Sequence, residues 1–315
     1  KLHLTPVIQL AGVRQINIRH LTKEILIFLT SNIGFYTLPL RQPKLWILMY
    51  HRVLPPSDAR YAEEEPGMIV HPETFEMHIK VLKQHFDIIS LEDWVEIVKS
   101  GLKPPKRACA ITFDDGWLDN YEYALPIIQK HNIPTTLFAV EGMIGTKLNF
   151  WPNRVAKLLA TLQLDNSDTT ALQWMGEPAL KCLSSDLPFK EQAAQVISHL
   201  KAFDDAYILE HITKSEAKFK TQPEPAPQLM SWEQLSKMHH SGLVNVGCHT
   251  HSHIRSHQNL SDSMLNKELV QSKEAIQEKL DTNVELFCYP NGDFNNAAYS
   301  LVKQSYHAAV STKRG

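Results

Sequence analysis

The sequence predicts an α/β fold, a distorted or incomplete (β/α) barrel of about seven parallel strands with a helical insertion. Short apolar runs alternate with amphipathic helical patterns along most of the chain, which is typical of a parallel sheet covered by helices. Polar motifs directly follow several of the runs. The ends of barrel strands converge on one face, whereas an open sheet would spread such motifs along a crevice, so we favour the barrel. The expected strands are residues 45–50, 87–90, 107–113, 134–140, 243–248, 284–289 and 307–312.

Composition excludes several classes of protein. The chain has 315 residues, 43% of them hydrophobic and 21% charged, which is typical of a globular protein of one large or two ordinary domains. A net charge of −2 gives no electrostatic case for nucleic acid. Four scattered cysteines without a CxxC pair indicate neither a disulfide framework nor a cysteine zinc site. No apolar stretch reaches the roughly 20 residues of a membrane span, so the compartment, cytoplasm or cell envelope of a bacterium, stays open.

Residues 1–40 are expected to form a helical extension before a domain of residues 41–315. Residues 21–33 have an amphipathic pattern, with basic residues nearby. Such a helix could attach to a membrane surface or to exopolysaccharide machinery. The alternative, a helix packed on the domain, is the one we favour.

The elements of the first half follow from local signals. The run 45–50 is continuously apolar, as in a buried strand, and ends at His51. Apolar residues at i, i+4 and i+7 predict a helix over 72–85. Ser90, with an acid three residues later, predicts the start of the next helix, and Gly101 its end. A helix over 118–130 with one apolar face then precedes the strand 134–140.

The alternation of strand-like apolar runs with helical patterns is interrupted over residues 141–228. This segment has helical patterns over 153–164, 189–203 and 206–220, no convincing strand, and a proline-rich end. We interpret it as a helical insertion, a lid or cover on one rim of the barrel.

The alternation resumes at Ser231, which opens a capping box, and Gly242 ends the helix that follows. The strand 243–248 leads into a histidine cluster, and Ser261 caps a long helix over 262–280. The last expected elements are the strand 284–289, a turn at 290–292, a helix over 295–303 and the strand 307–312.

Two polar clusters carry the chemistry. Asp114 and Asp115 are adjacent carboxylates, which are costly unless they share a proton or face a cation. A hairpin turn is the alternative for this Asp-Gly pair, but the pattern after it is helical rather than that of a strand. Residues 249–253 hold three histidines. Two imidazoles and one carboxylate leave an open position, as in a catalytic zinc site. Spacing alone does not select the pair, and a histidine-rich polar loop is the alternative.

The motifs resemble those of the polysaccharide deacetylases, carbohydrate esterase family 4. Residues 112–116 (TFDDG) are similar to the first motif of that family, and residues 249–253 (HTHSH) to its His-Ser/Thr-x-x-His motif. Residues 289–292 (YPNG) are similar to its third motif, and residues 48–53 (LMYHRV) to the opening strand of bacterial members linked to exopolysaccharide. The resemblance covers residues 45–315 and is loosest over the insertion.

The resemblance implies a metal-dependent deacetylase acting on an acetylated glycan. Asp115, His249 and His253 would bind the metal, usually Zn²⁺, with another divalent transition metal possible; His251 and His257 would not. Asp114 would be the general base that activates the attacking water. The metal and the backbone N–H of Asn291 would stabilise the oxyanion.

Two departures from the family pattern concern the catalytic proton transfers. The Arg that often orients the base, three residues before the proline, is replaced by Phe287. No motif in residues 307–315 supplies the usual histidine general acid, so either the chain ends before that motif or another residue is the donor. His51 is our candidate for this role, and a structural histidine at the strand end is the alternative.

Aromatic residues near the motifs could stack on sugar rings. Trp117, Tyr289 and Trp151 are the candidates, with Pro290 beside them, and core packing is the alternative for each ring. The leading hypothesis is N-acetyl hydrolysis on an amino-sugar polymer or oligomer. The alternatives are O-acetyl ester hydrolysis on a polysaccharide, and a glycan-binding protein that has lost turnover.

Overall fold

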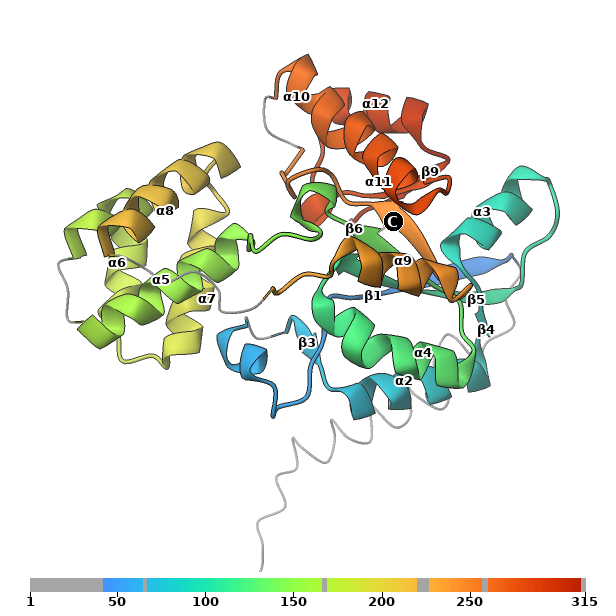
Figure 1. Ribbon diagram of the computed structural model, residues 1–315, viewed down its shortest axis with the longest axis horizontal. Helices are drawn as coiled ribbons and strands as arrows, with labels where there is room; N and C mark the ends of the chain where they lie inside the picture. The colour runs from blue at the N-terminus through green and yellow to red at the C-terminus, as the bar shows by residue number, and fades with distance from the viewer. Residues whose placement is uncertain (1–41, 65–66, 166–168, 220–226, 257–259, 313–315) are drawn as a thin grey trace, which may run out of the picture. The chain divides into compact units, whose positions relative to one another are not determined.

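The computed structural model of the chain describes residues 42–64, 67–165, 169–219, 227–256 and 260–312. The fold in Figure 1 starts with the first strand of the sheet. The predicted extension 1–40, with its helix over 21–33, lies outside the described residues and stays a prediction.

A single sheet of seven parallel strands forms the centre of the fold, so the predicted incomplete barrel is confirmed (Figure 1). The order is β1-β5-β6-β7-β8-β9, and β4 pairs with the start of β5. Because β1 and β9 are the two ends of this order, the sheet is a curled half-barrel rather than a closed one. The strands are β1 (Lys44–Tyr50), β4 (Asp87–Ile88), β5 (Arg107–Asp115), β6 (Thr135–Ala139), β7 (Val244–Cys248), β8 (Leu286–Cys288) and β9 (Ala308–Val310).

A second, two-stranded sheet was not predicted. It pairs β2 (Arg52–Val53) with β3 (Ile69–Val70) in parallel, directly after His51. Two residues per strand are too few for a periodic signal, which is why the sequence gives no indication of it.

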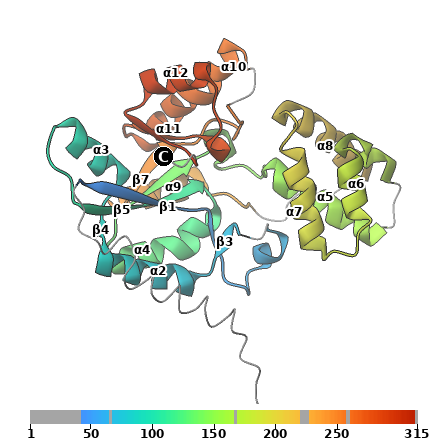
Figure 2. The same ribbon diagram turned by 180° about the vertical axis from the view of Figure 1, so that it is seen from behind.

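The predicted helices around the sheet are present (Figures 1 and 2). Two of them contain a π-helical turn, at Asn120–Ala124 before α4 and at Lys267–Gln271 between α10 and α11. The expected caps form, since the hydroxyls of Ser90 and Ser231 accept from backbone N–H groups at the starts of α3 and α9. The helices are α2 (Pro72–His85), α3 (Leu91–Lys99), α4 (Leu125–His131), α9 (Trp232–His240), α10 (Asp262–Asn266), α11 (Ser272–Leu280) and α12 (Asn296–Ser305).

Alternation along the strands sorts side chains onto two faces of the sheet. On β5, Cys109, Ile111 and Phe113 belong to the large core formed with α2, α4 and α9–α12. Ala110 belongs to a separate small core with Phe138 and Cys288. This alternation places Asp114 on the same face as Ala110, opposite to the helices of the large core.

The insertion forms a helical lobe with a hydrophobic core of its own. We use "helical lobe" for residues 151–219, which contain α5 (Trp151–Asp165), α6 (Glu177–Leu183), α7 (Phe189–Leu200) and α8 (Asp205–Phe219) (Figure 1). Three of these helices were predicted. The fourth, α6, spans seven residues, too short for a clear 3.6-residue period.

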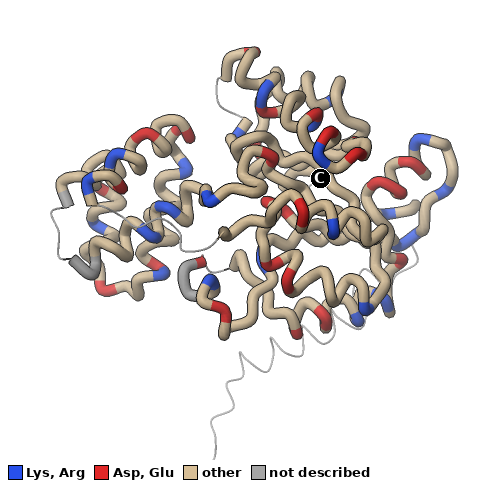
Figure 3. The backbone as a smooth tube through the Cα atoms, viewed as in Figure 1, with Lys and Arg blue, Asp and Glu red and all other residues tan. Residues whose placement is uncertain are grey.

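The described residues show neither a large patch of one charge sign in the view of Figure 3 nor a helix that could span a membrane. Lys and Arg are interspersed with Asp and Glu along the chain in the view of Figure 3, with no gathering of one sign. None of the described helices is both long enough and apolar enough to cross a bilayer.

Candidate active site

The carboxyl ends of β1, β5, β7 and β8 lead to one cavity of about 500 Å³. Most of the residues singled out in the sequence line this cavity, so the structure brings the separate motifs together as the barrel prediction requires. Pro290 is buried and is not among the residues that line the cavity. The lining residues from the predicted site are His51, Asp114, Asp115, Trp117, Trp151, His249, His253, Tyr289 and Asn291.

The two carboxylates lie at the last two positions of β5 and are both buried. Asp115 has a left-handed backbone (φ 77°), which turns the chain out of the strand just after Asp114. Gly116 follows with φ 85°, and a Cβ at this position would lie 2.6 Å from Cδ1 of Ile144. The indole Nε1 of Trp117 donates to Oδ2 of Asp115 at 2.8 Å, which leaves Oδ1 directed to other partners.

Two of the clustered histidines face Asp115. Nδ1 of His249 lies 2.7 Å from the carbonyl oxygen of Cys288, which can only accept, so Nδ1 carries the proton. Nε2 of His249 therefore keeps its lone pair, 3.6 Å from Oδ1 of Asp115. Nε2 of His253 lies 3.4 Å from the same oxygen. His251 instead contacts Oε2 of Glu141 at 2.5 Å, away from this cluster.

The chemistry of this cluster fits a divalent transition metal. The ligand atoms of Asp115, His249 and His253 all lie within 4.8 Å of one another. Oδ1 of Asp115 is buried without a hydrogen-bond partner among the described residues, the condition of an oxygen reserved for a cation. One carboxylate and two neutral imidazoles form a ligand set typical of catalytic zinc.

The protonation states favour the same conclusion. Burial lowers the pKa of His249 to about 3, with the neighbouring His253 adding to the effect. Burial also lowers the pKa of His253. Although burial alone would raise it, the pKa of Asp115 is lowered by His253, His51 and His249. At neutral pH the three groups are thus in the forms that bind metal, two neutral rings and one carboxylate.

Asp114 is the other buried carboxylate, and its environment differs. Burial raises its pKa to about 7, and the charge of Asp115 adds to the rise. The Cys288 thiol lies 3.5 Å from Oδ2 of Asp114 and donates to it. Burial also raises the pKa of this thiol well above its usual range, so Cys288 stays protonated.

Cys288 also takes part in a second group that could hold a metal, with Asp114 and His249. A thiol binds metal as the thiolate, and the buried Cys288 resists ionisation. The set with Asp115 and His253 is therefore the better metal site. The contact between Cys288 and Asp114 was not predicted, because no spacing in the sequence indicates it.

The aromatic residues expected to stack on sugar line the cavity but are largely buried. Trp117 is 1% exposed, with the Arg52 guanidinium 4.2 Å from its ring centre and Phe150 against its edge. Tyr289 is 4% exposed and packs between Phe287 and Phe294. Trp151 is also buried and belongs to the lobe core. Packing thus covers much of each ring, and stacking on a sugar stays a prediction.

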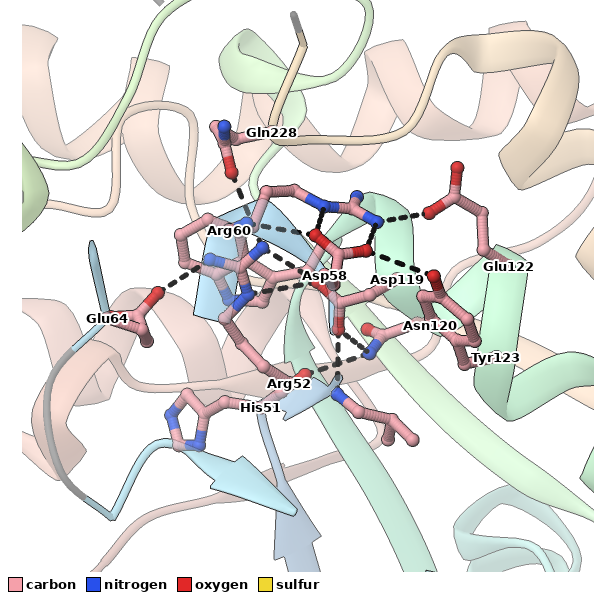
Figure 4. A network of polar contacts seen from close by, with 12 residues as sticks. His51, Arg52, Asp58, Arg60, Glu64, Asp119, Asn120, Glu122, Tyr123 and Gln228 are labelled. Carbon is pink, nitrogen blue, oxygen red and sulfur yellow. Dashed lines mark hydrogen bonds and ion pairs between the residues drawn. The ribbon is translucent and has the colours of Figure 1, made fainter. Parts of the chain in front are cut away.

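A buried polar network lies directly behind the site and was not predicted (Figure 4). Arg52 donates to Asp119 at 2.9 Å and to Glu64 at 2.7 Å, and all three side chains are at most 3% exposed. Asn120 donates to the carbonyl oxygen of His51 at 2.8 Å. The network thus fixes the backbone of His51 and supports Trp117, the partner of Asp115.

A comparison with known protein families identifies the family of this chain. The family model described as "Polysaccharide deacetylase" matches residues 101–310, most of the chain. The chain therefore belongs to the polysaccharide deacetylase family, a family of hydrolases acting on acetylated carbohydrate.

Two curated relatives share parts of the chain. The "Putative polysaccharide deacetylase YxkH" of Bacillus subtilis is 31% identical over 105 residues, 33% of this chain and 34% of that protein. A "Poly-beta-1,6-N-acetyl-D-glucosamine N-deacetylase" of Staphylococcus aureus is 40% identical over 85 residues, 27% of this chain and 29% of that protein. The matches thus span about a third of the length of these relatives.

Two solved structures share the fold. The Streptococcus pyogenes deacetylase PplD in complex with acetate superposes with a TM-score of 0.55 at 18% identity, covering 87% of this chain and 86% of that one. IcaB from Ammonifex degensii superposes with a TM-score of 0.52 at 18% identity, covering 85% and 83%. At this identity the likeness establishes the half-barrel architecture.

Proposed function

We propose that this protein removes N-acetyl groups from an amino-sugar polysaccharide or oligosaccharide, with zinc or another divalent transition metal as its cofactor. The observation that carries the proposal is the cluster of Asp115, His249 and His253 with Asp114 beside it in one cavity. Family membership supplies the reaction class, and the cluster supplies residues suited to it.

Asp115, His249 and His253 would hold the metal ion. When bound, the ion supplies Lewis acidity, which makes water more acidic and a carbonyl more electrophilic. The open side of such a three-ligand site leaves room for water and the acetyl group.

Asp114 is the group that we assign to accept the proton of the attacking water. Its pKa, raised by burial to about 7, matches the need of a general base at neutral pH. The Cys288 thiol holds one oxygen of the carboxylate, and the other oxygen has no partner among the described residues. That free oxygen is the one available to the water.

The remaining roles go to His51 and Asn291. His51 lines the cavity, and we assign it to protonate the leaving amine as the carbon–nitrogen bond breaks. The backbone N–H of Asn291 is assigned to the oxyanion, because its left-handed backbone (φ 54°) turns the chain at the rim of the cavity.

The substrate we propose is a poly-N-acetylglucosamine chain. The S. aureus relative, 40% identical over 85 residues, carries that substrate in its name. O-acetyl ester hydrolysis uses nearly the same chemistry, so the test includes an O-acetylated glycan.

The experiment measures acetate release from β-1,6-linked N-acetylglucosamine oligomers after chelation, with and without added zinc. An Asp114→Asn variant and partially acetylated xylan run in parallel. Zinc-dependent release from the oligomers that is lost in the variant supports the proposal. Release from xylan alone would establish the esterase. Tight zinc and glycan binding without release from either would establish a binding protein.

A further inference from the structure

The loop that carries His253 continues into a buried arginine, Arg255, which is 2% exposed. Its backbone N–H donates to Oδ2 of Asp205 at 2.8 Å, and its Nε donates to Oδ1 at 2.9 Å. Its two terminal nitrogens donate to the carbonyl oxygens of Lys201 and Phe203. All four bonds therefore join this loop to the corner between α7 and α8 of the helical lobe, about fifty residues earlier in the chain.

This corner suits a cation. Lys201 caps the carboxyl end of α7, where carbonyl groups lack helical partners, and Asp205 is the first residue of α8. A guanidinium can bond both the free carbonyls and the carboxylate in a fixed geometry, which a flexible ammonium cannot. The junction consequently sets the position of the loop relative to the lobe, two residues from a predicted metal ligand.

The start of the lobe contacts the metal site from its other side. Phe150, directly before α5, lies edge-on to both His253 and Trp117, with ring centres 5.0 and 5.1 Å apart. In α5, Asn153 donates to Glu64 at 3.2 Å. Glu64 pairs with Arg52, which lies over the Trp117 ring (Figure 4). The lobe thus reaches the indole that bonds Asp115 as well as the loop of His253.

We propose that the helical lobe is a positioning element for the metal site, acting through the Arg255–Asp205 junction on His253 and through Asn153 and Glu64 on Asp115. The inference rests on the proposed function of the site. This role differs from that of a separate lid, which would open and close over the site without holding its residues. The buried bonds instead connect the lobe to the loop of His253 and, through Glu64 and Arg52, to Trp117. Partners of metal ligands commonly change metal affinity by about 10–100-fold when they are lost.

The test compares Asp205→Asn with Glu216→Gln in the full chain. Both substitutions are isosteric and remove one carboxylate charge from an Arg pair. Glu216 bonds Arg154 within the lobe, at 2.9 and 2.6 Å, away from the metal ligands. Zinc affinity is measured by competition with a chelator, and the absorption spectrum of the cobalt-substituted protein reports ligand geometry. We expect Asp205→Asn to bind zinc at least about tenfold more weakly, with an altered cobalt spectrum, and Glu216→Gln to match the wild type.

The milder variant Arg255→Lys keeps the charge and is measured in the same way, so that a misfolded Asp205→Asn protein does not end the test. Circular dichroism of the metal-free proteins establishes folding. Folded junction variants with wild-type zinc affinity and cobalt spectrum would overturn the positioning role while leaving the metal site intact. A wild-type protein that binds no zinc would instead overturn the proposed site, and the junction proposal with it.

Discussion

Trp117→Phe is the most direct test of how the carboxylate ligand is held. The substitution keeps an aromatic ring in the buried position against Arg52 and Phe150 but removes the indole N–H. That N–H donates to Oδ2 of Asp115 at 2.8 Å. Without it, the carboxylate is free to rotate, and Oδ1 no longer has one preferred direction toward His249 and His253.

The magnitude follows from the type of bond that is lost. A hydrogen bond to a charged group contributes about 1.5–3 kcal/mol, more than a neutral one. Since about 1.4 kcal/mol is tenfold in an equilibrium constant, zinc affinity should fall roughly tenfold to a hundredfold. The carboxylate and the indole are both at most 4% exposed, so the bond is little weakened by solvent and the effect belongs at the upper part of this range.

The assay is zinc affinity by chelator competition, with Trp174→Phe as the matched control. The Trp174 indole donates to the hydroxyl of Ser215 at 3.0 Å inside the helical lobe, so the control also loses an indole hydrogen bond, to a neutral acceptor that is not a predicted ligand. We expect the control to bind zinc as the wild type does. Equal zinc affinity in Trp117→Phe and wild type, with both proteins folded, would refute the argument that the indole orients Asp115.

Three further predictions concern the base, its titration and the buried network. Asp114→Asn should lower kcat by about 10²–10⁴-fold with zinc affinity retained, measured by acetate release and chelator competition; weakened zinc binding would instead make Asp114 a ligand. Burial raises the pKa of Asp114 to about 7, and a bound cation opposes this rise. Because the base must be ionised, kcat/KM of the zinc-loaded enzyme should increase with pH through the acidic range, and an activity that falls over this range would contradict the assignment. Arg52→Met should lower the free energy of unfolding by about 3–5 kcal/mol in urea, because Glu64 and Asp119 stay buried without their cation. Lys181→Met, in a pair that is 74% and 75% exposed, should change it by less than about 1 kcal/mol, and equal losses would refute the reasoning.

The sequence was sufficient to predict the half-barrel and the meeting of its motifs. Continuous apolar runs mark the buried strands β5 and β7, and the carboxyl ends of parallel strands meet on one side. Asp114, Asp115, His249 and His253 follow these two runs, so their convergence needed no information beyond strand order. The prediction of a buried strand was wrong for β1, which lies at the edge of the sheet with two apolar side chains 43% and 46% exposed. Their roles depended on the family resemblance, because spacing alone could not choose between His251 and His253.

The contacts that support the site could not be predicted, because they join residues whose separations carry no periodic signal. Asp205 and Arg255 are 50 positions apart, and Glu64 and Asn153 are 89 apart. The position of Trp117 could not be predicted for a related reason. A tryptophan after such a motif can stack on substrate or hold a ligand, and neither its 1% exposure nor its bond to Asp115 has a signal in the sequence.

The replacement of the orienting arginine by Phe287 has less consequence in this fold than the sequence suggests. Adjacent residues of a strand face opposite sides, and Phe287 packs into the large core against Tyr289 and Tyr306. Cys288, its neighbour, faces the other side and donates to Asp114. The group on β8 that contacts Asp114, the proposed base, is therefore the residue after Phe287, and this weak thiol donor constrains the carboxylate while leaving its pKa high. Asp114 thus has a partner from the expected strand, so the loss of the arginine does not by itself favour a protein without turnover.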